Sequence, residues 1–406
     1  MEHVTPYLLT VNKGVRTGTA AYRRINLALF CAGFVTFVTL YDVQPLLPLF
    51  AHEFGVSPAM ASLPLSIATW ALAIGMLLAG TISESVGRRP LIGLALILTS
   101  VLALATWFCH SFASLLTLRL VQGVALAGVP SVAMAYLAEE MDSRAISSAM
   151  GLYISGNAFG GMTGRIGSAL LSDHLPWHAA IAILGLVSLV LSLVFLRSLP
   201  CAVNFRRRPF RLGYLFSSLV HQMRDPGLLC LYGLAFLCMG GFVSLYNYIG
   251  FRLLAPPYSL TQSSVSLIFM VYLLGSFSSG VVGQLVNRFG RPTMIRLSLA
   301  TMLAGTFITM AGAVPLIVIG VGIFTCGFFC AHAIASSWVG RRASTGKAQA
   351  SSIYLFCYYQ GSSISGTMGG MFWQHFGWQG VATMITMLIL AAFGVSALLL
   401  KLPAKD

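Results

Sequence analysis

The chain consists largely of long apolar stretches, and its charges are too few to cover a surface that faces water. Only 8% of the 406 residues are charged and 57% are hydrophobic, whereas a soluble domain carries about 25% charged residues. A helix needs about 20 apolar residues to cross the hydrocarbon layer. Lipid also requires each crossing segment to satisfy its own backbone hydrogen bonds, which favours helices. The sequence therefore predicts an all-α polytopic membrane protein.

Hydropathy predicts twelve transmembrane helices in two groups of six. The first group is 25–50, 60–82, 90–109, 113–137, 146–171 and 178–198, and the second is 227–250, 262–286, 292–312, 314–339, 347–372 and 379–400. The longest segment between helices is the basic linker 199–226, which separates an N-terminal bundle (25–198) from a C-terminal bundle (227–400). The tails are residues 1–24 and 401–406.

Lysine and arginine are concentrated in alternate loops. If the N-terminus is cytoplasmic, all but three of the 24 lie in cytoplasmic segments, the exceptions being Arg119, Arg165 and Arg252. Because positive residues favour the cytoplasmic side, we expect a multi-pass protein of the bacterial inner membrane with both termini in the cytoplasm. The net charge of +14 then faces anionic lipid head groups and not nucleic acid. We expect membrane lipids as partners, and a monomer.

The two halves carry matching motifs. Residues 80–89, after the second helix, correspond to 283–291 after the eighth, and residues 173–178 correspond to 374–379. Two motifs that recur at nearly one offset indicate an internal repeat. Repeated bundles that rock about a midplane site are common in secondary transporters.

The same motifs resemble those of the major facilitator superfamily. Residues 80–89 are similar to its motif A, and residues 115–123, centred on Arg119, to its motif B. Residues 156–161 look like motif C, which is associated with antiporters, although Asn157 replaces the expected Pro. The resemblance implies two pseudo-symmetric six-helix bundles.

More narrowly, residues 151–157 and 335–338 resemble the YnfM-type group of bacterial inner-membrane transporters, whose substrates are poorly defined.

The motif A resemblance implies a conformational latch at the cytoplasmic rim. Glu84 is placed to face a helix N-terminus, or an arginine such as Arg88 or Arg144. An acidic side chain beside arginines at an interface is often simply solvated, but the recurrence of the loop in the second half favours the latch. The residues assigned to the latch are Gly80, Glu84, Gly87, Arg88, Arg89, Arg144, Gly283, Asn287, Gly290 and Arg291.

Three charges are predicted to lie within the membrane: Asp42, Arg119 and Arg165. An ionised group at such depth costs at least about 2.5–3.5 kcal/mol, so it should face a partner or a cavity. At about 1.5 Å per residue, all three lie roughly 9–12 Å from the outer ends of their helices. They suit a structural ion pair, a proton site in which Arg119 tunes Asp42, or a positive layer that binds an anion.

Other polar residues are candidates for the transport path. With the two arginines, the predicted substrate-binding residues are Gln44, Arg119, Asn157, Arg165, Tyr246, Asn247, Tyr358 and Gln360. Such residues also join transmembrane helices to one another. His332 is expected to pack locally, with a proton relay as the alternative.

We therefore predict a secondary transporter that exports a small organic molecule in exchange for protons, with the proton gradient as energy source and no cofactor. The alternative is an uptake carrier or uniporter for an anionic metabolite held by Arg119 and Arg165. The sequence has no metal-ligand cluster and no nucleophile–base motif, so we do not expect an enzyme. A sensor or scaffold would carry a sizeable soluble domain, and the sequence lacks one.

Overall fold

The computed structural model describes residues 14–205, 207, 212–343 and 346–403. Parts of the predicted tails (1–13 and 404–406) and of the predicted linker (206 and 208–211) lie outside the described residues. The description below concerns the remainder.

The N-terminal half contains six crossing segments. They are α1 (Ala20–Tyr41) continued by η1 (Gln44–Leu46) and α2 (Leu47–Glu53); α4 (Leu63–Val86), preceded by α3 (Pro58–Ala61); α5 (Arg88–Ala105) with η2 (Thr106–Phe108); α6 (Phe112–Leu126) with α7 (Pro130–Glu140); α8 (Ile146–Ser172); and α9 (Trp177–Ser198). A short helix, α10 (Leu212–Gln222), lies in the linker.

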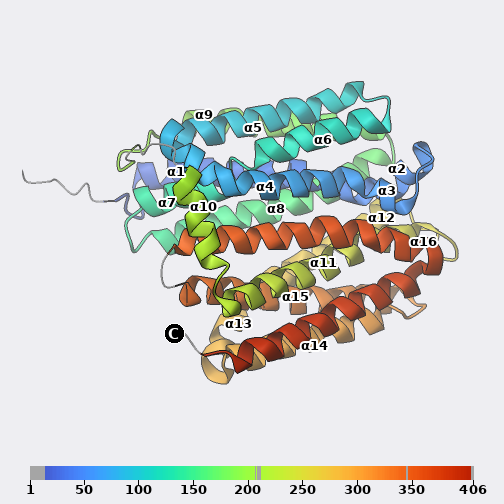
Figure 1. Ribbon diagram of the computed structural model, residues 1–406. Coiled ribbons are helices and arrows are strands. Elements are labelled where there is room, and N and C mark those ends of the chain that lie inside the picture. The colour runs from blue at the N-terminus through green and yellow to red at the C-terminus, as the bar shows by residue number, and fades with distance from the viewer. Residues whose placement is uncertain (1–13, 206, 208–211, 344–345, 404–406) are drawn as a thin grey trace, which may run out of the picture.

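The C-terminal half repeats this arrangement. Its segments are α11 (Pro226–Leu254); α12 (Gln262–Ser266) with η3 (Leu267–Val271) and α13 (Tyr272–Phe289); α14 (Arg291–Ile308); α15 (Val314–Arg342); and α16 (Lys347–Lys401). The predicted helices 347–372 and 379–400 are joined in α16, which turns back at Gly377, where φ is +56° (Figure 1).

Twelve crossings result in the described part of the chain. Nine helical segments there are long and apolar enough to span a membrane. One of them, α16, holds two crossings, and α8 and α14 complete the set (Figure 1). The predicted all-α, twelve-helix fold is confirmed.

The first crossing is interrupted in its final third. α1 ends at Tyr41, and a 3-10 turn follows before α2. Pro45 and Pro48 lack backbone N–H groups, so they cannot continue the hydrogen-bond ladder of α1. The break leaves Asp42 and Gln44 on irregular backbone inside the bundle, where both are buried.

Helices α1 and α8 touch backbone to backbone. Gly156, Gly160 and Gly164 of α8 face carbonyl oxygens of α1, and a Cβ at Gly160 would lie 2.2 Å from the Phe34 oxygen. Small residues permit this approach. The C-terminal half repeats it at Gly361, whose Cβ would lie 2.1 Å from the oxygen of Phe236.

The two bundles meet at one end of the molecule, which we call the closed end, where α2, α3 and α12 lie (Figure 1). One hydrophobic core includes Leu47 and Leu65 of the first bundle together with Ile249 and Val265 of the second. Helix α16 packs on α3 and α4, and α12 packs on α8. Towards the opposite end, where the chain terminates, the first bundle has a separate core around Tyr136.

Candidate functional site

Asp42 and Arg119 form a buried ion pair. Their side chains are 0% and 1% exposed, and Nη1 of Arg119 lies 3.1 Å from Oδ1 of Asp42. The other carboxylate oxygen, Oδ2, is buried and has no hydrogen-bond partner in the described residues. The pairing of these two residues agrees with the sequence prediction, and the unpartnered oxygen is a position at which a proton can bind.

Arg119 also caps the broken end of α1. It donates to the carbonyls of Thr39 (2.8 Å), Leu40 (2.6 Å) and Pro64 (3.2 Å). It donates further to Oε1 of Gln122 at 2.6 Å. The last carbonyls of a helix have no partner within it, and a cation at this end is favoured by the helix dipole. The interrupted first helix therefore holds the ion pair in place.

Arg165 lies apart from this pair. Its Nε donates to Oε1 of Gln44 at 2.6 Å, and its Nη1 donates to the carbonyl of Gly161 at 2.8 Å. The guanidinium lies over the rings of Tyr41 at 3.9 Å and Tyr272 at 4.7 Å. The sequence grouped both arginines around Asp42, and the structure separates them, because Tyr41 and Asp42 are successive residues that point to different neighbours.

Arg165 is not part of any ion pair in the described chain. Those ion pairs join Arg88 to Glu139, Arg119 to Asp42 and Arg342 to Asp225. Arg165 is only 3% exposed, so a buried cation contacts neutral oxygens and aromatic rings alone.

Gln44 links Arg165 to the other bundle. Its Nε2 donates to Oδ1 of Asn247 on α11 at 2.8 Å. Beside this link lies a small cavity of about 10 Å³ between η1 and α2 on one side and α11, α12 and η3 on the other. Tyr246 lines the same cavity and bonds Thr325 at 2.7 Å. Four of the predicted substrate-binding residues thus come together: Gln44, Arg165, Tyr246 and Asn247.

Hydroxyl groups close the space between the bundles. Thr69 and Ser363 are 2.8 Å apart, and Thr367 donates to Ser66 at 2.9 Å. Nearer the surface, Asp173 accepts from the backbone N–H of Ser263 at 3.0 Å. These bonds cross from α4 to α16 and from the end of α8 to α12.

Asn157, Tyr358 and Gln360 lie elsewhere. Asn157 packs against α1, where its Oδ1 is close to Gly33 and has no hydrogen-bond partner among the described residues. Gln360 is buried on α16 and its Nε2 has no partner in that part of the chain. Neither residue joins the group around Arg165.

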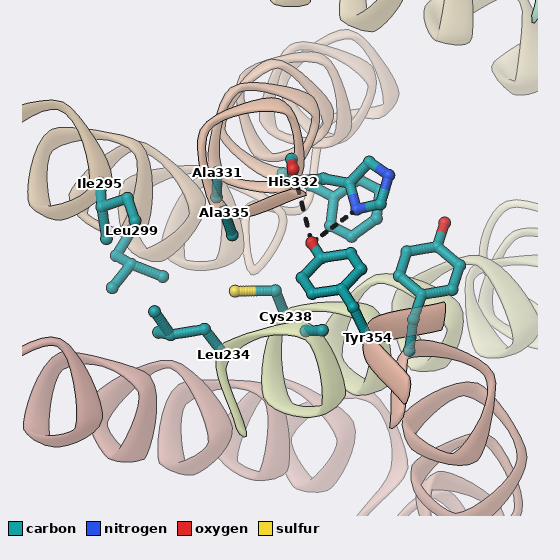
Figure 2. Close-up of a pocket in the computed structure, with 11 residues that line it drawn as sticks. Leu234, Cys238, Ile295, Leu299, Ala331, His332, Ala335 and Tyr354 are labelled. Atoms are coloured by element: carbon teal, nitrogen blue, oxygen red, sulfur yellow. Dashed lines mark hydrogen bonds between the residues drawn. The ribbon is translucent and has the colours of Figure 1, made fainter. Parts of the chain in front are cut away.

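Tyr358 lines a second small cavity of about 10 Å³, inside the C-terminal bundle (Figure 2). In Figure 2 the hydroxyl of Tyr354 points at His332, and its oxygen lies 3.0 Å from Nδ1 of that ring. Leu234, Cys238 and other apolar side chains form most of the remaining wall. The sequence analysis missed this cavity, although two tyrosines four residues apart on one helix were a signal for a shared aromatic face.

The predicted latch residues lie at the opposite end of the molecule. Arg88 pairs with Glu139 at 2.7 Å and also bonds the Gly80 carbonyl and Ser83. Glu84 is half-buried, and the carboxylate that Arg88 uses is Glu139, which the sequence analysis did not single out. Motif spacing alone does not reveal this partner, because it comes from the end of α7.

The glycines and remaining arginines of the motif have separate roles. Gly87 (φ +111°) and Gly290 (φ +77°) occupy a backbone region that favours glycine. Arg89 donates to the Leu196 carbonyl, and Arg291 lies over Trp338. Three other predicted residues, Arg144, Gly283 and Asn287, are exposed.

Two six-helix bundles that close at one end around buried polar and charged groups define a transporter of the alternating-access class. The comparisons agree, and the chain belongs to the Major Facilitator Superfamily, which it matches over residues 26–366. It is therefore a multi-pass membrane transporter and not an enzyme, and the Escherichia coli relative described next supports an inner-membrane location.

Two relatives match nearly their whole length. The chain is 48% identical to the "Uncharacterized MFS-type transporter YybF" of Bacillus subtilis over 96% of this chain and 98% of that protein. It is 43% identical to the "Inner membrane transport protein YnfM" of Escherichia coli, over 94% of this chain and 91% of that protein. Among solved structures, a mutant of the nucleoside transporter NupG has the same fold, with a TM-score of 0.76 and 13% identity. The match covers 92% of this chain and 99% of the NupG chain.

Proposed function

We propose that this transporter exports a small organic molecule in exchange for protons, and that Asp42 is the residue that carries the proton. The observation behind the proposal is the buried pair in which Oδ1 of Asp42 contacts Arg119 while Oδ2 has no partner in the described residues. Protonation removes the charge of Asp42 and weakens its hold on Arg119. Because Arg119 caps the end of α1, this change reaches the backbone between the bundles.

Coupling requires that protonation bias one conformation over the other. Arg119 donates to the Pro64 carbonyl in the first turn of α4, and the same helix carries the Thr69 hydroxyl that contacts Ser363 of the other bundle. The ion pair is thus connected to the contacts that close the bundles. Export in particular is supported by the resemblance of residues 156–161 to motif C, whose Gly156 and Gly160 pack against α1.

The positive loops support a cytoplasmic location for both termini. With that orientation, the closed end faces the periplasm and this conformation is inward-facing. The N-terminal bundle (25–198) and the C-terminal bundle (227–400) then rock as two bodies of a monomer. Anionic lipids contact the cytoplasmic rim.

The latch belongs to that rim. Arg88 with Glu139, and Arg342 with Asp225 at 2.8 Å, tie helix ends within each bundle. Glu84, half-buried and close to Arg88 in sequence, is left to engage the other bundle when the cytoplasmic end closes.

The first test measures conformation and needs no substrate. Spin labels are coupled to cysteines introduced at His52 and Ser264, which are exposed at the closed end on the two bundles, after exposed Cys201 is replaced by Ser. We expect the distance distribution to change between pH 8 and pH 5. Asp42→Asn should abolish the change, and the loop control Asp142→Asn should retain it. If the distance between the two spin labels in the parent protein is the same at pH 8 and pH 5, proton coupling is contradicted.

The direction of transport is tested in vesicles. Inside-out vesicles with an acidified interior receive a neutral, a cationic and an anionic compound (chloramphenicol, ethidium and benzoate). An exported antiport substrate dissipates the gradient, and Asp42→Asn should abolish this effect.

Uptake of an anion is a second candidate, favoured by the absence of a carboxylate beside Arg165 in the described ion pairs. Uptake predicts that the anion alkalinises the medium of right-side-out vesicles and leaves the gradient of inside-out vesicles intact.

A further inference from the structure

Arg165 is a buried cation whose contacts in the described chain are with uncharged groups. The guanidinium is 3% exposed and lies among three aromatic rings, with Phe269 at 5.3 Å completing the set formed by Tyr41 and Tyr272. Its hydrogen-bond acceptors are Gln44 and a backbone carbonyl. Buried charges in proteins are normally paired, so this cation is suited to a counter-ion supplied by a ligand.

Two further donors, on residues linked to Arg165, are buried and without a hydrogen-bond partner in the described chain. They are Nδ2 of Asn247 and the hydroxyl of Tyr272. Asn247 is joined to Arg165 through Gln44, and Tyr272 contacts Arg165 directly. All three groups are hydrogen-bond donors, so a ligand that only accepts hydrogen bonds suits each of them. A carboxylate is such a ligand, and its two oxygens match the fork of an arginine.

The lining of the adjoining cavity indicates the chemistry of the rest of the ligand. The room left inside this lining is about 10 Å³, about that of one water molecule, so the lining is informative about the chemistry of the ligand and not about its size. Gln44, Asn247 and Gln262 form its polar side, and most of the remaining wall is Pro45, Pro48, Tyr246, Ile249, Val265 and Phe269. An apolar or aromatic body matches the chemistry of that remaining wall.

We infer that the transported molecule is a small monocarboxylate with an apolar or aromatic body, and that Arg165, Asn247 and Tyr272 bind its carboxylate. Arg119 is not the anchor, because it is neutralised by Asp42 and donates to four other oxygens. One unneutralised cation at the site matches one carboxylate. The inference rests on the proposed transport function and names the substrate class for it.

The test is a binding measurement on the purified full-length protein, with benzoate as probe and benzamide as its uncharged isostere. We expect benzoate to bind at least tenfold more tightly than benzamide. Arg165→Gln should weaken benzoate binding at least tenfold, and Asn247→Ala several-fold. Arg165→Lys keeps the positive charge but loses the paired N–H donors of the guanidinium. Its affinity for benzoate should lie between those of the parent protein and Arg165→Gln.

Arg252→Gln is the matched control. Like Arg165, Arg252 is an arginine beside aromatic rings, although it is only partly buried. It lies over Trp378 at 5.3 Å and donates to the carbonyl of Ala311 at 2.8 Å. This variant should bind benzoate like the parent protein. Thermal unfolding of each variant verifies that it is folded.

The inference is overturned if the parent protein fails to bind benzoate, if benzamide binds equally well, or if folded Arg165→Gln binds benzoate unchanged. Asp42→Asn separates the two proposals, since it should bind benzoate normally while losing the response to pH. Benzoate binding without any pH response contradicts only the proton coupling, and a pH response without benzoate binding contradicts only the substrate class.

Discussion

At the scale of single residues, the two membrane arginines have different tasks that their positions in the sequence did not distinguish. Arg119 uses its whole guanidinium, with Nε, Nη1 and Nη2 all donating to oxygens around the end of α1. Arg165 makes few hydrogen bonds and lies against rings. The first arginine holds the structure together around Asp42, and the second is available to a ligand.

Replacing Arg119 by lysine keeps the charge and removes the fork. Lysine has three donors on one atom and cannot reach the carbonyls of Thr39, Leu40 and Pro64 together. Each buried acceptor left without a donor costs about 1–3 kcal/mol. We expect Arg119→Lys to lower the midpoint of thermal unfolding, whereas Arg197→Lys, at an exposed position, should leave it unchanged. Equal midpoints for the two variants contradict the capping role.

At the scale of helices, the sequence predicted the crossings well because their signal is local. Apolar length and loop charges are properties of each segment, so the twelve crossings followed from the sequence. The partners of Arg165 and Arg88 did not, because Gln44 and Glu139 come from other helices whose relative rotation no spacing encodes. Asn157 was grouped with the transport path, yet it lies in the α1–α8 contact.

The contact between α1 and α8 depends on the absence of side chains. A Cβ at Gly160 would lie 2.2 Å from the Phe34 carbonyl oxygen, and backbone atoms cannot move aside cheaply. Overpacking of this kind costs about 1–3 kcal/mol. Gly160→Val should therefore lower the midpoint of thermal unfolding measured by size-exclusion chromatography after heating. The control is Gly151→Val, on the same helix with open space around it. A similar decrease of the unfolding midpoint in both variants would contradict the packing argument.

At the scale of the whole molecule, most of the hydrogen bonds that join the two bundles at the closed end connect neutral groups, Asp173–Ser263 being a charged exception, and weak bonds of this kind are what alternating access requires. Thr69–Ser363, Thr367–Ser66 and Gln44–Asn247 are uncharged pairs. Each contributes only about 0.5–1.5 kcal/mol net, so the group is able to open and reform. The ion pairs of the described chain, in contrast, each lie within one bundle.

A cross-link at the closed end should therefore stop transport. The side-chain oxygens of Thr69 and Ser363 are 2.8 Å apart across the bundles, so the variant Thr69→Cys/Ser363→Cys is expected to form a disulfide on oxidation. Substrate-driven proton flux in the vesicle assay should fall at least tenfold and return with dithiothreitol. The control pair is Ser100→Cys/Ser192→Cys, whose hydroxyls are 3.2 Å apart within the N-terminal bundle. Its cross-link should leave the flux intact, because bundles that move as rigid bodies tolerate an internal bond and not one between them. Full flux through the oxidised Thr69–Ser363 variant would mean that this end never opens.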